Sequence, residues 1–288
     1  MDNLKSQNSP TFQNHLEAQN LRIIAMTVCC MDVYPQKNKA YVGGNSINFA
    51  AECIRKGVKA SIVGCVGTDD YGWEIIDTLT KSGINVSCLH TRMGKTASNR
   101  IYISEKGERF FLPDSWDGGV YQTFILSEED WSFVFEHDIV AIPANNPNFQ
   151  TTLNRLGDSG KLVVDFLDSR DIQFIESALP RIALGFISGN REMATRLKSL
   201  SKSIAAPIVV TLGADGSITL LNGKEFYQEA VPVKTIVDTT GCGDSYQAAF
   251  AVSWWQEHSI PIAMKKGALA AAATLTHMGG IKKDLTSS

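Results

Sequence analysis

A glycine-rich segment in the C-terminal third of the chain places an acidic residue beside a potential anion-binding site. The string Asp238-Thr239-Thr240-Gly241-Cys242-Gly243-Asp244 directly precedes an apolar helical pattern. Glycines at a helix start let successive backbone N–H groups converge on an anion, and the helix dipole favours negative charge there. Asp244 would repel that anion unless it had a chemical task, such as accepting a proton from a hydroxyl that attacks phosphorus. The alternative is that Asp244 only caps the helix.

A second chemically suggestive segment lies much earlier, at Gly43-Gly44-Asn45-Ser46-Ile47-Asn48. Paired glycines let a ligand approach the backbone, and Asn48 offers both a donor and an acceptor to neighbouring hydroxyls. Asp32 follows the first predicted strand, and its carboxylate could accept hydrogen bonds from two hydroxyls of a diol. These residue types are compatible with a site for a polyhydroxylated molecule. The alternative, favoured for the glycine motif taken alone, is a glycine-rich loop with a polar helix start.

The elements that must position these residues alternate between β-rich runs and helical patterns. This alternation is typical of a parallel sheet covered by helices, and it predicts a mainly parallel three-layer α/β/α sandwich. The predicted strands are residues 22–28, 60–66, 138–142, 161–166, 184–188 and 207–212. The first predicted helix starts near Ser46. Five further helices are predicted over residues 71–82, 127–136, 190–202, 243–257 and 261–277.

Two further extended stretches interrupt this alternation and predict a small separate sheet that acts as a lid. Residues 97–104 and 108–112 are strand-like and flank the turn Glu105-Lys106-Gly107, while residues 31–42 are extended without an intervening helix. We therefore expect a domain over residues 21–283 with lid segments near 31–42 and 95–113. Residues 1–20 are polar and are expected to form a flexible tail.

Composition narrows the class of protein further. The 288 residues are 44% hydrophobic, enough for a full-sized core, and the net charge of −3 lacks the basic character of nucleic-acid binders. No apolar stretch approaches the length that spans a bilayer, and no secretory signal opens the chain. The six cysteines show no C-x-x-C spacing, which favours reduced thiols. The expected compartment is the cytoplasm, with neither nucleic acid nor membrane as partner.

The segment ending at Asp244 resembles the C-terminal signature of the ribokinase-like carbohydrate kinase family, Asp-Thr-x-Gly-Ala-Gly-Asp. The resemblance implies that Asp244 is the catalytic base and that the backbone amides of Gly241, Cys242 and Gly243 form the anion hole. Cys242 replaces the usual alanine. Both residues are small, and it is the backbone amide that binds.

The earlier glycine-rich segment resembles the N-terminal signature of the same family. The resemblance implies that Gly43, Gly44 and Asn48 contact the substrate and that Asp32 binds its hydroxyls. Family members often carry Gly-Asp or Gly-Glu upstream of this Asp, where the present chain has Thr27-Val28.

Further resemblances concern the nucleotide and the metal ions. Thr211, Gly213 and Gly216 match a Thr-x-Gly-x-x-Gly segment, which in the family approaches ATP. Glu192 falls where the family has a Glu tied to the water shell of Mg²⁺, although Gly189 occupies the position of the usual Asn. Asp238 matches a loop that binds a monovalent cation, such as K⁺, in some members.

The resemblance as a whole implies an ATP-dependent kinase that phosphorylates a primary hydroxyl of a ketose or ketosamine. Local strings at residues 30–40, 66–72 and 126–130 are most similar to the branch of the family that phosphorylates fructosamines at the 6-position. A sugar amine is positively charged, so a carboxylate near the lid is expected, with Asp114 and Asp117 as candidates.

Alternatives stay open at this point. Within the family, the chain could be a fructokinase, a ribokinase or a nucleoside kinase. A different class would be an idle member that binds a sugar or nucleotide as a regulator. A dinucleotide-binding oxidoreductase is disfavoured because no G-x-G-x-x-G follows the first strand. A homodimer through the lid sheet is expected, with Ile101, Tyr102 and Phe111 either on that surface or in the core.

Overall fold

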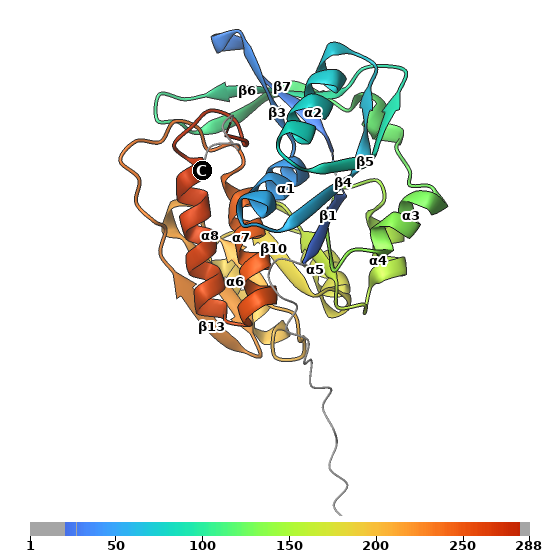
Figure 1. Cartoon of the computed structure of the whole chain (residues 1–288). Helices are drawn as coiled ribbons and strands as arrows, with labels where there is room; N and C mark the ends of the chain where they lie inside the picture. The colour runs from blue at the N-terminus through green and yellow to red at the C-terminus, as the bar shows by residue number, and fades with distance from the viewer. Residues whose placement is uncertain (1–20, 27, 283–288) are drawn as a thin grey trace, which may run out of the picture.

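The middle layer of the computed structural model, which describes residues 21–26 and 28–282, is a nine-stranded sheet (Figure 1). All neighbours from β11 through to β5 pair in parallel, whereas β12 and β13 are antiparallel. In spatial order the strands are β13 (Lys224–Gln228), β12 (Ser217–Leu221), β11 (Ile208–Thr211), β10 (Leu184–Ser188), β9 (Leu162–Asp165), β8 (Ile139–Pro143), β1 (Arg22–Met26), β4 (Lys59–Gly67) and β5 (Asn85–Arg92).

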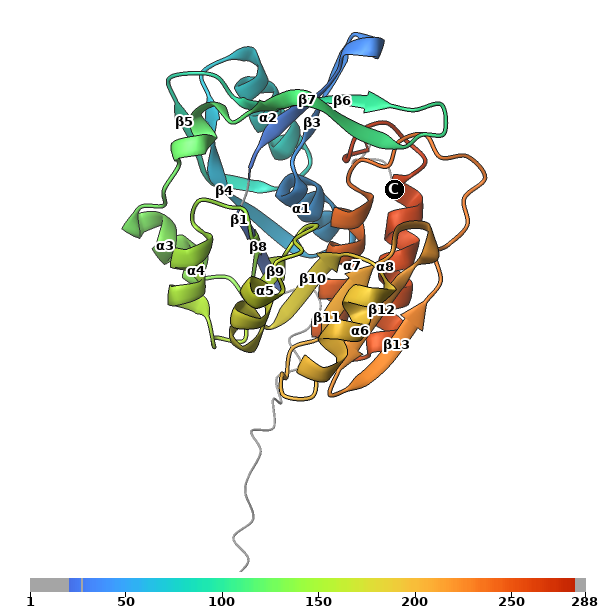
Figure 2. The same ribbon diagram turned by 180° about the vertical axis from the view of Figure 1, so that it is seen from behind.

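Helices cover both faces of this sheet, as the two opposite views show (Figures 1 and 2). One face carries α1 (Asn45–Arg55), α2 (Asp70–Lys81), α7 (Cys242–Glu257) and α8 (Ile260–Thr274). The other carries α3 (Glu128–Phe135), α4 (Phe149–Leu156), α5 (Ile172–Ala178) and α6 (Arg191–Leu200). Along β1, Ile23 and Ala25 join one hydrophobic core while Ile24 and Met26 join the other. Strands buried on both faces therefore read as continuous apolar runs.

The predicted α/β sandwich is confirmed, and the differences are local. The edge strand β5 and the short helices α4 and α5 were not predicted. Residues in β5 are half-buried or exposed and include polar residues such as Asn85 and Arg92, because this edge strand has a neighbour on one side only. Ser46 does not cap α1: Gly44 is the N-cap, and the Ser46 hydroxyl instead donates to the backbone oxygen of Met26. Residues 1–20 and Thr27 lie outside the described part of the chain.

A second sheet of four strands stands off the main layers and is called the lid sheet below (Figure 1). Its spatial order is β3 (Lys39–Gly43), β2 (Cys30–Tyr34), β6 (Ala97–Ile103) and β7 (Arg109–Asp117). The extended stretch predicted over 31–42 is thus a hairpin, β2 and β3, joined by a short 3-10 turn. The register between β6 and β7 shifts between Asn99 and Ile101, so that β7 bulges outward over residues 112–115.

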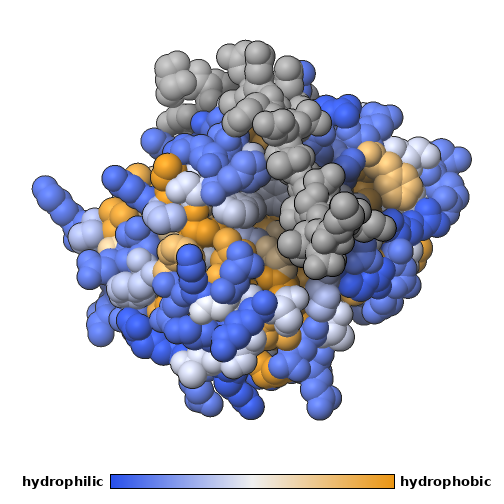
Figure 3. Space-filling model, turned by 90° about the horizontal axis from the view of Figure 1, so that it is seen from below, coloured by the Kyte–Doolittle hydropathy of each residue, from blue (hydrophilic) through white to orange (hydrophobic). Residues whose placement is uncertain are grey.

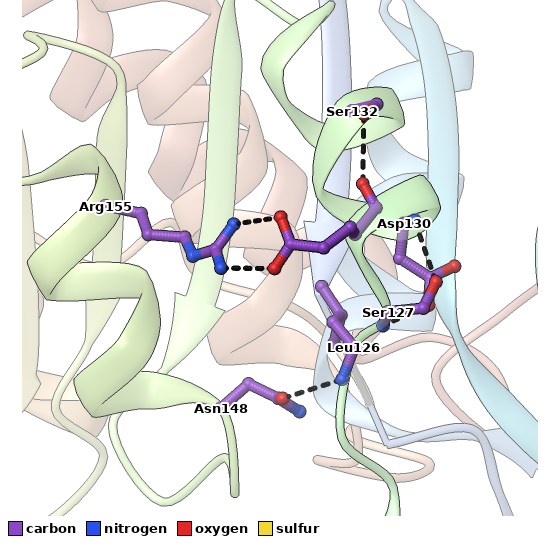
Figure 4. A network of polar contacts seen from close by, with 7 residues as sticks. Leu126, Ser127, Asp130, Ser132, Asn148 and Arg155 are labelled. Atoms are coloured by element: carbon purple, nitrogen blue, oxygen red, sulfur yellow. Dashed lines mark hydrogen bonds and ion pairs between the residues drawn. The ribbon is translucent and has the colours of Figure 1, made fainter.

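Polar contacts join α3 to the segment around α4 on one flank of the molecule (Figure 4). The guanidinium of Arg155 forms a two-pronged ion pair with Glu128, at 2.9 and 2.5 Å. Asn148 accepts from the backbone N–H of Leu126 at 3.0 Å. These contacts add to the packing of the two short helices, whose Trp131, Val134, Phe149 and Leu153 are buried in the core.

The pole opposite the lid carries hydrophilic residues and separate apolar patches (Figure 3). A hollow of about 430 Å³ opens at the amino ends of the strands and is lined in part by Arg22, Lys59 and His137. Both ring nitrogens of His137 form hydrogen bonds, one with Ser61 and one with the backbone oxygen of Phe133. His137 therefore has no free ring nitrogen for catalysis in this hollow. Among the described residues, no helix combines the length and apolar character needed to cross a membrane.

Candidate active site

The start of α7 forms a cradle of backbone amides beneath the lid sheet. Gly241 is the N-cap and adopts a left-handed conformation, with φ of 76°. A side chain there would place its Cβ 2.7 Å from the Cα of Gly280, so only glycine fits. Gly243 is exposed with open space around it. First-turn N–H groups have no partner within their helix, and they can therefore bind an anion.

Asp244 lies in this first turn but does not cap the helix. Its Oδ2 accepts a hydrogen bond of 2.8 Å from Nδ2 of Asn48, which lies on α1. Burial raises the pKa of Asp244 to about 7, and the nearby Asp165 raises it further, while the Asn48 hydrogen bond and the charge of Arg109 lower it. The carboxyl group is therefore poised to exchange a proton near neutral pH.

Asn48 is held between the two glycine-rich segments and the end of the chain. Its side chain is buried, and among the described residues its Oδ1 has no hydrogen-bond partner. A Cβ on Gly280 would lie 2.1 Å from that oxygen, so this glycine leaves the only space that Asn48 can occupy. Sequence reasoning missed Gly280, because nothing local distinguishes it from an ordinary turn glycine.

Asp32 lies on β2 and is buried, with 6% of its surface exposed. Its carboxylate passes directly over Gly43, where a Cβ would be 2.1 Å from Oδ2. Gly44 has φ of 110°, and a Cβ there would meet the backbone oxygen of Val28 at 2.3 Å. Burial raises the pKa of Asp32 to about 7, and the Arg109 charge lowers it. The two glycines are thus needed to seat the carboxylate and to turn the chain into α1.

Asp238 joins the lid to the loop before α7. It is fully buried, and its two oxygens accept hydrogen bonds from the hydroxyl of Tyr34 at 2.8 Å, from N–H of Thr240 at 2.8 Å and from N–H of Gly279 at 2.9 Å. Tyr34 comes from β2 of the lid sheet. The side chain of Asp238 therefore already serves three protein donors.

A second attachment joins the lid hairpin to the same loop. The N–H of Arg109 donates to Oγ1 of Thr239 at 3.0 Å, and the N–H of Thr239 donates to the backbone oxygen of Gly107 at 3.2 Å. The Arg109 guanidinium lies 4.3 Å from the ring centre of Phe111, and its charge lowers the pKa of both Asp32 and Asp244. Sequence reasoning missed Arg109. The available signal was a cation two residues after the lid turn.

The Thr211 to Gly216 segment lies at the end of β11 and turns into β12. Gly213 and Gly216 have φ of 61° and 89°, and a Cβ on Gly216 would lie 2.0 Å from the backbone oxygen of Gln228. Ser217, the next residue, shares a hydrogen bond of 2.8 Å with the hydroxyl of Tyr246 on α7. This bond ties the predicted nucleotide segment to the helix that carries Asp244.

Glu192 is exposed in the first turn of α6, apart from the buried acids. Asn190 caps this helix by accepting from N–H of Met193 at 2.9 Å. Gly189 packs against β11, where a Cβ would lie 2.9 Å from Cγ1 of Val210. Within residues 21–26 and 28–282, no group of three or more His, Cys, Asp or Glu side chains could enclose a metal ion. Glu192 fits contact through water with a Mg²⁺ that is mainly held by phosphate.

Two remaining predictions concern the lid. Asp114 lies in the β7 bulge, has φ of 47° and is exposed. Asp117 pairs with Ser98 and accepts from N–H of Gly119 at 3.0 Å. Asp117 therefore shares a face with Ser98, opposite to the face that carries Asp32.

Comparison with known proteins agrees with this fold and arrangement. Residues 23–286 match the model of the pfkB family carbohydrate kinases, and the chain belongs to this family. Its sugar-kinase class and its ribokinase-like fold are thereby established.

Among curated relatives, fructoselysine 6-kinase of Escherichia coli is 34% identical over 254 residues, which cover 87% of this chain and 95% of the relative. Fructosamine kinase of Bacillus subtilis is 26% identical, covering 88% and 90%. Among solved structures, adenosine kinase from Sinorhizobium meliloti superposes with a TM-score of 0.77 at 18% identity, covering 91% of this chain and 96% of that one.

Proposed function

We propose that this chain is a fructoselysine 6-kinase, which transfers the γ-phosphoryl group of ATP to the 6-hydroxyl of fructoselysine. The 34% identity to the Escherichia coli enzyme of that name supports the acceptor. The observation that supports the chemistry is the contact between Asp244 and Asn48, which places a half-buried carboxyl group at the start of α7 beside an amide that can bind hydroxyls.

In the proposed reaction, the carboxylate of Asp244 accepts the proton of the 6-hydroxyl as that oxygen attacks the γ-phosphorus. The new O–P bond forms while the bond from the γ-phosphorus to the β–γ bridging oxygen breaks, and ADP leaves with the electron pair. A base with a pKa near 7 is suited to this transfer, because about half of it is ionised at neutral pH and it still binds the proton well.

The start of α7 supplies the electrostatic stabilisation. The amides of Gly241, Cys242 and Gly243 are proposed to bind the transferring phosphoryl group. Burial, with a further contribution from Asp244, raises the pKa of the Cys242 thiol to about 11, so the thiol stays neutral beside the phosphates.

Substrate recognition is assigned to the opposite wall and to the lid. Asp32, Gly43, Gly44 and Asn48 are proposed to bind the sugar hydroxyls, and the free Oδ1 of Asn48 is available as an acceptor for one of them.

The nucleotide is proposed to lie along the segment between β11 and β12. Thr211, Gly213 and Gly216 are assigned to it; Gly213 leaves open space beside the turn, and Gly216 lets the turn pass close to the backbone of Gln228.

When bound with ATP, Mg²⁺ would neutralise phosphate charge, and Glu192 is proposed to hold one of its waters. A monovalent cation beside Asp238 stays a prediction. Because the Asp238 carboxylate already accepts three hydrogen bonds, it would act on such a cation mainly through its charge.

Two further proposals concern the setting of the enzyme. A cytoplasmic location is supported by the six cysteines, all of which are free thiols. A homodimer through the lid is supported by exposed Tyr102 and Phe110 on its outer face and by Phe111, whereas Ile101 is fully buried in the core. Sedimentation at micromolar concentration would test the dimer, and a monomer would contradict it.

The test of the function is ADP release with MgATP against fructoselysine, other fructosamines, fructose, ribose and adenosine. Preferred turnover of fructoselysine, with phosphate found on its 6-oxygen, is the expected result. A preference for another acceptor would replace the substrate with a fructokinase, ribokinase or nucleoside kinase activity. Absence of turnover on every acceptor would favour the idle regulator.

A further inference from the structure

Four residues form a row across the inner face of the lid sheet. The strand register pairs Tyr41 with Asp32, Asp32 with Asn99, and Asn99 with Trp116. Residues paired directly across neighbouring strands point to the same face of a sheet. Since the carboxylate of Asp32 lies over Gly43 beside the candidate site, this row faces that site as well.

Asn99 is unusual within this row because one of its polar atoms is unused. Its Oδ1 is buried, and the described residues provide it with no hydrogen-bond partner. A buried acceptor without a partner costs free energy, and the cost is removed if a ligand supplies the donor. The backbone of Asn99 lies one strand spacing, about 5 Å, from that of Asp32.

The next residue in the row is aromatic and accessible. Trp116 is 48% exposed although it is large and apolar, and it pairs with Asn99 next to the β7 bulge. An indole face in this position can cover an alkyl chain and attract a nearby cation. The cation Arg109 pairs with Ile103, farther along β6, so it lies at the end of the lid sheet that contacts the loop before α7.

Fructoselysine, the proposed acceptor, carries a secondary ammonium group with two N–H donors on C1 of the sugar. Two neighbouring acceptors, one of them charged, match such a group in number and in charge. A neutral ketose such as fructose has a hydroxyl in its place, which can donate only one hydrogen bond.

We infer that Asp32 and Asn99 accept the two N–H groups of the substrate ammonium and that Trp116 covers the alkyl chain attached to it. This subsite rests on the proposed function and explains how the lid distinguishes a ketosamine from a plain ketose. It also assigns the recognition of the amine to the inner lid face rather than to Asp114 or Asp117.

The test compares fructoselysine with its N-methyl derivative, whose tertiary ammonium has only one N–H. In the wild-type enzyme, methylation should lower kcat/KM by about tenfold or more, mainly through KM. In Asn99→Leu, kcat/KM for fructoselysine should fall by a similar factor, and methylation should then cost about twofold or less. Asn99→Asp, which keeps an acceptor of the same shape, should retain the preference and shows that the position tolerates substitution.

Ser98→Ala is the matched control, because Ser98 is the neighbouring residue on the outer face of β6, and it should behave as wild type. Trp116→Leu should lower kcat/KM for fructoselysine more than kcat/KM for fructose. An equal cost of methylation in wild type and in Asn99→Leu would overturn the subsite while leaving the proposed function intact. If wild type instead prefers fructose over fructoselysine, the proposed function fails, and the subsite fails with it.

Discussion

Helices α3 and α7 each carry an acidic residue in the first turn, and these two acids serve opposite purposes. At the start of α3, Asp130 and Ser127 form a reciprocal capping box, in which the carboxylate accepts from the backbone N–H of Ser127 and the Ser127 hydroxyl accepts from that of Asp130 (Figure 4). At the start of α7, Asp244 leaves the helix donors open and bonds to Asn48 instead. Although burial alone would raise it, hydrogen bonds from His90 and Ser127 hold the pKa of Asp130 below its usual range, whereas burial raises that of Asp244. The environment, not the residue type, separates a structural acid from a chemical one.

The largest expected difference between the two acids is in activity. Asp244→Asn should lower kcat by about 10²–10⁴-fold, because it removes the base and nearly preserves the shape. Asp130→Asn should leave kcat within about twofold of wild type, since that carboxylate contacts its own helix start and His90, on the far side of the sheet from Asp244. Coupled ADP-release assays on both variants measure this contrast, and a similar loss in both would remove the distinction.

The free energy of unfolding of the two variants should change in the opposite order to their activity. The pKa of Asp244 is higher in the folded protein than its ordinary value of 3.8, so stability from its protonated form is lost as pH rises from about 4 through 7. At pH 8, Asp244→Asn should therefore be more stable than wild type by about 1–3 kcal/mol. Asp130→Asn should be less stable by about 1 kcal/mol. Urea unfolding at pH 5 and pH 8 measures both, and a destabilised Asp244→Asn at pH 8 would contradict the assignment.

A glycine far from both motifs provides a test of the Asn48 contact. Gly280→Ala would place a methyl group 2.1 Å from the Asn48 Oδ1, which must displace the amide from Asp244. We expect kcat/KM to fall by about 10–100-fold, a loss comparable to misplacement of a catalytic group. Gly83→Ala, which meets no neighbouring atom, should keep wild-type kcat/KM. If Gly280→Ala is fully active, Asn48 does not orient Asp244.

The pH dependence of kcat/KM offers a test that does not alter the base. Because Asp244 must be ionised to accept a proton, kcat/KM should rise with pH through a midpoint near 7, reaching about one tenth of its plateau at pH 6. The Arg109 charge lowers this pKa, so Arg109→Gln should move the midpoint upward. A pH profile in which the midpoint stays fixed would show that Arg109 does not act on the base.

The smallest expected effect concerns the structural cap. Ser127→Ala should lower the free energy of unfolding by about 1 kcal/mol, because it removes the capping hydroxyl of α3. The kinetic constants should not change, since α3 lies on the far side of the sheet from Asp244. Thermal unfolding with parallel assays measures both quantities, and a change in KM would imply an unexpected link to the site.

Local sequence predicted those parts of the site that depend on local chemistry. The glycines around Asp244 and before α1 could be found because each motif folds within a few residues. Gly280 and Arg109 could not, since their importance comes from contacts with residues far away in sequence. Asn99 was missed for the same reason, because its position relative to Asp32 depends on which lid strands pair.

The fold followed a similar division. Strands buried on both faces were predicted because their apolar runs are continuous: β10 has its predicted bounds, and the bounds of the others differ by one or two residues. The edge strand β5 and the short helices α4 and α5 mix polar and apolar residues, because each is buried on one side only. Asp117 lies on the outer face because of the bulge in β7, and no residue pattern predicted that bulge.

The contact between Gly280 and Asn48 also has a consequence for synthesis. Asn48 leaves the ribosome early, whereas Gly279 and Gly280, which contact Asp238 and Asn48, are translated much later. The proposed hydroxyl-binding pocket is therefore incomplete on a nascent chain that has not yet reached Gly279, however well its first strands have folded. Premature termination just before Gly279 would release a polypeptide that contains every signature residue and lacks the glycine contacts that position Asn48 and Asp238.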